Sequence, residues 1–348
     1  MKKGLIYLLV GLIFLSVVSC DKKDAVTSVF PGRVQKLNSI ETISLNGMGL
    51  ENALFISQYG EWFIFRLFDL NEEKEMLAFY NPALEIVFKG APSGTGSSEL
   101  TSISSYVIEK NILYLFGPTE KRFIKVDIDE SIAAREVKVY EATEMGVIDL
   151  FNITRVYPVE GGFIGNQYTA GPSWYSLYGN DNIELSSVSY TNFDVIKNMT
   201  YQQKSSIHMQ SYVTIKPDKK RVAVAGLVFG AISFSEIDGR TLNEYKRYEF
   251  APPVIENSAS QMVYTSDEKR FFTPIVSNDE SIISLYRGIN RDAYFSHTYD
   301  LLRFNWEGEP VCHYRLDQAI TDVIMGSEPG TIWGLMREPD LKMLKYNL

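Results

Sequence analysis

The stretch Tyr59-Gly60-Glu61-Trp62-Phe63-Ile64-Phe65 decides the fold, because its pattern of a tight turn followed by an apolar strand returns along the chain. Six such hairpins occur in the 348 residues, at intervals of 49 to 61 residues. The residue before each second strand is Gly or Lys, which predicts the left-handed backbone conformation that closes a tight hairpin. The other copies are Glu109-Lys110-Asn111, Glu160-Gly161-Gly162, Asp218-Lys219-Lys220-Arg221, Asp267-Glu268-Lys269-Arg270 and Glu328-Pro329-Gly330-Thr331.

Each hairpin is followed by further segments in which apolar and polar residues alternate, a pattern typical of half-buried strands. Segments 123–127 and 301–305 are examples of a third strand, and 136–140 and 311–315 of a fourth. Four antiparallel strands in every ~50 residues, repeated around an axis, form a β-propeller. The sequence therefore predicts an all-β, six-bladed β-propeller. The alternatives are seven blades, with a degenerate repeat within 179–206, or two packed β-sandwiches.

The last repeat lacks an outer strand. It has candidate strands near 320–326, 332–336 and 342–347, and segment 33–46 precedes the first blade without a blade of its own. Pairing the two would remove a sheet edge, which otherwise invites aggregation. We therefore expect the N-terminal strand to complete the last blade, with residues 33–46 beside 341–348.

The N-terminus has the composition of a secretory signal. Lys2 and Lys3 precede an uncharged segment, 4–19, which is shorter than the ~20 apolar residues that a transmembrane helix needs. It ends in Val17-Val18-Ser19-Cys20, which resembles the bacterial lipobox, whose cysteine is lipidated. A signal anchor that keeps its segment is the alternative. We predict a lipoprotein signal peptide at 1–19, a lipidated Cys20 and tether at 20–32, and the propeller at 33–348.

Two internal segments extend this pattern. One is the Ser/Thr-rich run 94–103 ahead of a first strand, and the other is Lys125-Val126-Asp127-Ile128-Asp129, which closes a third strand. With the lipobox, they resemble the TolB-like six-bladed propeller lipoproteins of Bacteroidetes. The resemblance covers roughly residues 33–348. It implies a cell-envelope, outer-membrane lipoprotein, periplasmic or surface-exposed, tethered to the bilayer through acylated Cys20 and engaged mainly in protein–protein contact.

Composition argues against several classes of function. The net charge of −9 disfavours nucleic acid as a partner, because an acidic surface repels phosphates. The histidines, His208, His297 and His313, have no metal-ligand spacing to one another. Cys312 reads as a small buried hydrophobe, and Asp127 and Asp129 as strand-end or turn residues. The sequence thus predicts no cofactor, no metal site and no catalytic residue.

Extra length gathers at two places, which predicts where a ligand binds. Segment 191–207 separates the third and fourth blades, and 277–299 is predicted to join the second and third strands of the fifth. Loops on a rigid scaffold often carry binding sites, and aromatic and arginine side chains are frequent anchors there. The predicted contact residues are Tyr168, Trp174 and Tyr175 of a neighbouring loop, and Tyr286, Arg287, Arg291, Tyr294, His297 and Tyr299 of segment 277–299.

These residues favour a binding or interaction propeller with a protein, peptide or glycan ligand on the loop face. The alternative for the residues themselves is that their rings pack the insertions onto the blades. The rival function is a metal-dependent lactonase, or a lyase, centred on the channel and using carboxylates and amides of the first strands. Three or four such groups converging on one point would favour the rival.

Overall fold

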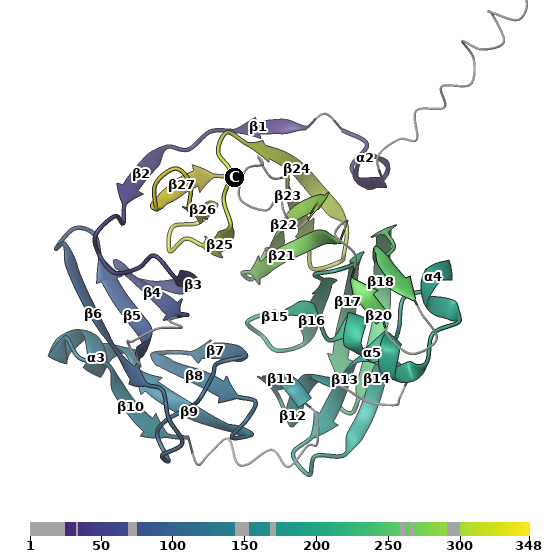
Figure 1. The fold of residues 1–348 in the computed structure, drawn as a ribbon, viewed down its shortest axis with the longest axis horizontal. Helices are drawn as coiled ribbons and strands as arrows, with labels where there is room; N and C mark the ends of the chain where they lie inside the picture. The colour runs from purple at the N-terminus through teal and green to yellow at the C-terminus, as the bar shows by residue number, and fades with distance from the viewer. Residues whose placement is uncertain are drawn as a thin grey trace, which may run out of the picture.

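The computed structural model describes residues 25–32, 34–68, 75–142, 153–167, 172–257, 262–264, 268–290 and 300–348. Six four-stranded antiparallel units are arranged radially around a central axis (Figure 1). The protein is therefore a six-bladed β-propeller, as predicted, and the seven-bladed and sandwich alternatives are wrong.

Each blade is built from consecutive strands, with its first strand innermost (Figure 1). Blades one to three are β3 (Ala53–Tyr59), β4 (Trp62–Leu67), β5 (Glu75–Asn81) and β6 (Ile86–Pro92); β7 (Ser105–Glu109), β8 (Ile112–Gly117), β9 (Arg122–Asp127) and β10 (Lys138–Glu141); and β11 (Ile153–Val159), β12 (Gly162–Gln167), β13 (Ser173–Gly179) and β14 (Glu184–Ser189). Blades four to six are β15 (Ser211–Ile215), β16 (Arg221–Gly226), β17 (Gly230–Asp238) and β18 (Thr241–Ala251); β21 (Lys269–Ser277), β22 (Ser281–Asn290), β23 (Asp300–Asn305) and β24 (Pro310–Leu316); and β25 (Asp322–Met325), β26 (Thr331–Met336) and β27 (Lys342–Asn347), while β19 (Ile255–Asn257) and β20 (Met262–Tyr264) form a separate hairpin.

The N-terminal segment closes the ring. Strand β2 (Glu41–Ser44) pairs antiparallel with β27, and Thr42 lies opposite Leu344. This confirms that the N-terminal segment completes the last blade. Strand β1 (Gln35–Leu37) instead pairs in parallel with β24 at the outer edge of the fifth blade, so one segment fastens two neighbouring blades (Figure 1).

A short helix, α2 (Ala25–Val29), precedes these strands. Val26 and Phe30 are 0% and 5% exposed, and the Phe30 ring lies 5.2 Å from that of Phe304 in blade five. Residues four apart share one face of a helix, so this pair docks the helix on the propeller. From Ala25 the described chain is docked on the propeller, within the segment 20–32 predicted as a tether, and Cys20 lies outside the described residues.

The left-handed turn positions are confirmed in four of the six blades. Gly60, Lys110, Gly161 and Gly330 have φ angles of 60°, 58°, 75° and 72°. In blade four the left-handed residue is Lys219, with φ 60°, rather than Lys220. The prediction therefore named the right chemistry there but was displaced by one residue.

The predicted hairpin turn of blade five, 267–270, is wrong. Strand β21 begins at Lys269, and the turn lies at 278–280, where Asn278 Oδ1 accepts hydrogen bonds from the Glu280 and Ser281 N–H groups at 3.0 and 2.9 Å. An Asn side chain that bonds the backbone two residues on is itself a turn signal. The connection between second and third strands is consequently 291–299 rather than 277–299, and it lies outside the described residues.

The insertion between blades three and four is helical, which was not predicted from the sequence. It contains α4 (Asp194–Lys197) and α5 (Tyr201–His208). Thr200 and Gln203 form a reciprocal capping box at the start of α5. Among the described residues, no helix has the length and apolarity to cross a membrane.

A further helix, α3 (Ile128–Ala134), explains the carboxylates of the third-strand motif in blade two. Asp127 caps it by accepting a hydrogen bond from the Glu130 N–H at 2.9 Å. Asp129 accepts one from the Tyr59 hydroxyl at 3.0 Å. Asp127 is a strand-end residue, as predicted, whereas Asp129 lies in the first turn of α3.

Candidate functional site: the central channel

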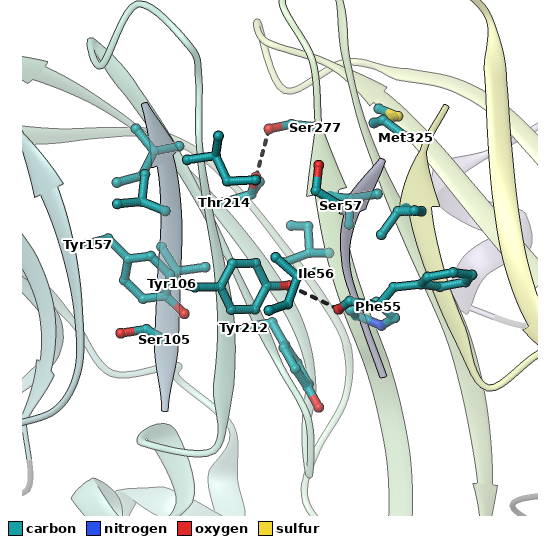
Figure 2. Close-up of a pocket in the computed structure, with 18 of the residues that line it drawn as sticks. Phe55, Ile56, Ser57, Ser105, Tyr106, Tyr157, Tyr212, Thr214, Ser277 and Met325 are labelled. Carbon is teal, nitrogen blue, oxygen red and sulfur yellow. Dashed lines mark hydrogen bonds between the residues drawn. The ribbon is translucent and has the colours of Figure 1, made fainter. Parts of the chain in front are cut away.

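The first strands of all six blades line a cavity of about 760 Å³ on the propeller axis. Small-molecule sites commonly occupy ~300–1,000 Å³. Hydrogen bonds tie neighbouring walls together: the Thr214 and Ser277 hydroxyls lie 2.7 Å apart, and the Tyr106 hydroxyl donates to the Phe55 carbonyl at 3.4 Å (Figure 2). The channel is therefore a preformed space with walls from every blade.

One end of the cavity lies where the first strands begin, and it contains two arginines. Arg66 on β4 donates to the Ile103 carbonyl at 2.6 Å, and its guanidinium lies 4.0 Å from the centre of the Phe68 ring. Arg155 on β11 donates to the Ser211 carbonyl. We call this the arginine end; it also contains Tyr106, Tyr157, Tyr212 and Asp322.

Neither guanidinium forms an ion pair with a carboxylate of the described residues; their polar partners there are backbone carbonyls. Both arginines line the cavity, and no nitrogen of either is a buried atom without a partner among the described residues. Burial lowers the pKa of Arg66, and the positive charge of Arg155 lowers it further, whereas Tyr106, Tyr212 and Asp322 oppose this. The two cations thus share one electrostatic environment.

Asp322 is the carboxylate of this end, and it hydrogen-bonds to backbone groups in the wall of the channel. Its Oδ2 accepts a hydrogen bond from the Phe55 N–H at 2.6 Å, and its Oδ1 accepts from the Val323 N–H at 3.0 Å. Burial raises its pKa to about 6, although both hydrogen bonds and the charges of Arg337 and Arg66 favour the ionised form. The charge of the arginine end therefore increases as Asp322 takes up a proton near pH 6.

The opposite end, which we call the lysine end, contains Glu109, Lys110, Lys216 and Lys219. An ion pair joins Lys219 of blade four to Glu109 of blade two. Lys216 pairs with Asp218 at 2.9 Å. Two of its three cations are therefore matched by carboxylates of the protein itself.

The lining as a whole has a charge opposite to that of the protein. It contains five basic side chains and two carboxylates, whereas the chain has a net charge of −9. Ten lining residues bear hydroxyls, namely Ser57, Ser104, Ser105, Tyr106, Tyr157, Tyr212, Thr214, Thr273, Ser277 and Thr321. The described walls thus favour a ligand that is anionic and rich in hydrogen-bonding groups.

Trp174 and Tyr175, predicted as contact residues, are core residues instead. Both lie on β13 and are 1% exposed. The Trp174 indole donates to the Ser211 hydroxyl at 2.9 Å, and the Tyr175 hydroxyl lies 2.8 Å from those of Ser233 and Ser235. Because they form part of a strand rather than a loop, they pack the blade and cannot anchor an external partner.

Tyr286 and Arg287 are also buried, at 7% exposure each, on β22. The Tyr286 ring lies 5.2 Å from that of Phe272, and Arg287 donates to the Thr321 carbonyl at 2.8 Å. Both belong to the interior because β22 extends through them to Asn290. The other predicted contact residues, Tyr168, Arg291, Tyr294, His297 and Tyr299, lie outside the described residues, and for them the loop-face surface stays a prediction.

The described histidines lie apart from the channel. His208 is buried beneath the helical insertion, where burial lowers its pKa to about 3, and Thr191 hydrogen-bonds its Nε2. His313 lies 3.2 Å from Asp300 on the fifth blade. Within the part of the chain that the structure describes, no three His, Cys, Asp or Glu side chains gather in a way that could hold a metal ion.

The residues of the arginine end were not among those predicted from the sequence. Arg155 and Tyr157 are two apart on β11, so they share one face of the strand. The available signal was alternation within each predicted first strand, which places every second side chain in the channel. That signal identifies inward positions but does not show that Arg66, from a second strand, reaches the same space.

Comparisons with known proteins support the fold. No family model matches the chain, and no curated protein matches it. Among solved structures, it is similar to a member of the DUF4221 family from Bacteroides vulgatus, with a TM-score of 0.51 and 8% identity over 90% of this chain and 98% of that one. The β-propeller domain of Cps50 (Swd1) from Myceliophteria thermophila has a TM-score of 0.41 and 8% identity over 90% and 99%. At these identities the first likeness shows the propeller fold alone.

Proposed function

We propose that the protein is a membrane-tethered binding protein that holds its ligand in the central channel. The observation that carries this proposal is the cavity of about 760 Å³ lined by all six first strands, whose lining includes ten hydroxyl-bearing residues and two arginines at one end. A largely preformed cavity with a few convergent polar groups is the usual form of a ligand site. Its size suits a small molecule or the end of a glycan or peptide.

The described carboxylates of the channel argue against the rival hydrolase. Asp322 and Glu109 lie at opposite ends, and each already has partners within the protein. A metal-dependent lactonase needs several oxygen ligands around one point. The arrangement in the described walls is that of a binding site for an anion rather than for a cation.

The channel site is tested by filling it. In the full chain in detergent, Ser57→Trp places an indole in the cavity, whereas Ser97→Trp makes the same change in an exposed turn between blades one and two. Thermal unfolding is measured with a panel of neutral and acidic sugars, amino acids and short peptides. At least one compound should raise the midpoint of the wild type and of S97W but not of S57W. Equal shifts in all three proteins, or no shift with any compound, would contradict the proposal.

The membrane tether rests on Val17-Val18-Ser19-Cys20. Acylation of Cys20 would leave Asp21-Lys22-Lys23-Asp24 between the lipid and the docked helix α2. Cys20→Ala should abolish incorporation of labelled palmitate and move the protein out of the membrane fraction, whereas Cys312→Ala should do neither. Membrane association that survives Cys20→Ala would show a signal anchor instead.

A further inference from the structure

We infer that the arginine end of the channel is a recognition site for an acidic sugar, whose carboxylate is bound by Arg66 and Arg155. This inference rests on the proposed function, because it names the ligand class of the same cavity. It follows from three observations on the described walls: the state of the two arginines, the rings that flank them, and the hydroxyls beyond.

The arginines supply an incomplete set of hydrogen bonds. Each guanidinium has five N–H donors, and one polar contact, to a backbone carbonyl, is present for each within the described residues. That contact fixes the direction of the group without neutralising its charge. A carboxylate can then take two parallel N–H bonds from a guanidinium, which is the strong geometry for this pair.

Three phenol rings flank the arginines. Tyr106, Tyr157 and Tyr212 project from the first strands of blades two, three and four toward the channel (Figure 2). The Arg155 guanidinium lies 5.1 Å from the Tyr212 ring. Aromatic faces at this position offer flat apolar contact to a ring-shaped ligand, and buried phenols favour ligands that also hydrogen-bond. The apolar C–H face of a sugar ring matches such a surface.

The hydroxyls of the lining match the rest of a sugar. Hydroxyl groups both donate and accept, as sugar hydroxyls do. Among the described residues, Ser104 Oγ and Thr273 Oγ1 line the cavity yet have no hydrogen-bond partner, and Thr273 is 3% exposed. A ligand that hydrogen-bonds to either hydroxyl would satisfy a group that is otherwise costly to bury. A bare anion would use the arginines but leave these groups unmatched, so it should bind more weakly.

Titration calorimetry on the full chain in detergent tests the assignment. The probes are glucuronate and galacturonate, their neutral counterparts glucose and galactose, and inorganic sulfate. The uronates should bind at least about tenfold more tightly than the neutral sugars and sulfate, because a buried polar site discriminates strongly against ligands that leave it unpaired. Binding of sulfate as tight as that of the uronates would show a general anion site and overturn the sugar assignment.

Two arginine variants and a matched control locate the site. Arg155→Gln should weaken glucuronate binding by at least about tenfold, and Arg155→Lys, which keeps the charge but loses the forked geometry, should be intermediate. Arg66→Gln should act in the same direction. Arg240→Gln, in the exposed turn between β17 and β18, should leave affinity unchanged. The thermal midpoint of each variant shows whether it folds. If Arg66→Gln does not fold, the affinity of Arg155→Lys for glucuronate tests the role of the guanidinium groups.

The outcomes separate this inference from the proposed function. Equal affinity for glucuronate and glucose, or an Arg155→Gln variant that binds like the wild type, would overturn the acidic-sugar assignment alone. If no uronate binds, but S57W abolishes the binding of another compound, the channel remains the ligand site and only the acidic-sugar inference fails. Glucuronate binding that S57W leaves intact would place the ligand elsewhere and overturn both.

Discussion

The two ends of the central channel both contain basic side chains, but the protein treats their charges differently. At the lysine end, Lys219 pairs with Glu109 and Lys216 with Asp218. At the arginine end, Arg66 and Arg155 are held by neutral carbonyls, and no described carboxylate is paired with either. A cation matched by the protein's own carboxylate is neutralised within the protein, whereas one held only by carbonyls keeps its charge.

Arginine-to-carbonyl contacts also recur away from the ligand site. Arg287 of blade five donates to the Thr321 carbonyl at 2.8 Å, and Arg337 of blade six donates to the Ala53 carbonyl. Arg66 does the same from blade one to Ile103, ahead of blade two. In each case an arginine at or beyond a second strand holds the chain entering the next blade. Of these three, Arg66 also lines the cavity, so one structural device has become part of the site.

The largest difference between the ends should appear when both cations of an end are removed. The double variant Arg66→Gln/Arg155→Gln should weaken glucuronate binding about a thousandfold, because each hydrogen-bonded charge contributes ~1.5–3 kcal/mol. Lys216→Gln/Lys219→Gln should change it less than about threefold, because those charges are already paired and distant. Calorimetry on both proteins measures the contrast. Similar losses at the two ends would mean that the whole channel, rather than one end, attracts the anion.

A second contrast concerns folding stability and Asp322, the buried carboxylate of the arginine end. Its pKa of about 6, against an ordinary 3.8, means that the folded protein binds its proton more tightly than the unfolded chain does. The contribution of protonated Asp322 to the free energy of unfolding is complete below pH ~4. It is lost as pH rises through 6, a change of about 3 kcal/mol. Asp322→Asn keeps an acceptor for the Phe55 N–H but cannot ionise, so it should become relatively more stable toward pH 7.

Urea unfolding of the wild type and Asp322→Asn between pH 4 and pH 7.5 measures this difference. Asp238→Asn, at the exposed end of β17, is the matched control and should follow the wild type. Parallel stability curves for the wild type and Asp322→Asn would show that Asp322 ionises normally in the folded protein.

The same proton should change ligand affinity. The charges of Arg337 and Arg66 favour the ionised form of Asp322, and the charge of Asp322 acts in turn on Tyr106. When Asp322 is neutral, the arginine end is more positive, so glucuronate should bind about fivefold more tightly at pH 5 than at pH 7.5, the equivalent of ~1 kcal/mol between charges in a partly screened site. Asp322→Asn should remove this pH dependence. If glucuronate affinity depends on pH in Asp322→Asn as it does in the wild type, another group is responsible for the pH dependence.

The sequence predicted the fold through local and repeated signals. Gly60, Lys110, Gly161 and Gly330 adopt the left-handed turns expected of them, and β2 pairs with β27 as the count of strands required. The hairpin turn of blade five was placed wrongly because its turn signal, Asn278, lies inside the segment 277–299, which was predicted to be a loop. The helix α5 is eight residues long, too short to be stable by propensity alone, and its packing depends on tertiary contacts such as those of buried His208.

The candidate site could not be predicted in the same way. Arg66 and Arg155 come from different blades, and no spacing in the sequence shows that both reach one end of the channel. Trp174 and Tyr175 look like loop anchors by composition, but the strand β13 extends through them and turns both into core residues. A propeller site depends on which strand is innermost and on the register of its hairpin, and an error in either moves a side chain to another surface.

The smallest expected effect is at the lysine end, and it measures how little that end contributes to stability and to ligand affinity. Glu109→Gln removes the partner of Lys219, and the two side chains are 35% and 33% exposed. Because the pair is partly screened by solvent, its loss should lower the free energy of unfolding by less than about 1 kcal/mol, and by less still in high salt. Glucuronate affinity should stay within about twofold, since the freed lysine lies at the far end of the channel. Urea unfolding at low and high salt, with calorimetry, tests both statements; a marked gain in affinity would show that Lys219 joins the anion site once it is released, and the two ends would then differ in pairing alone.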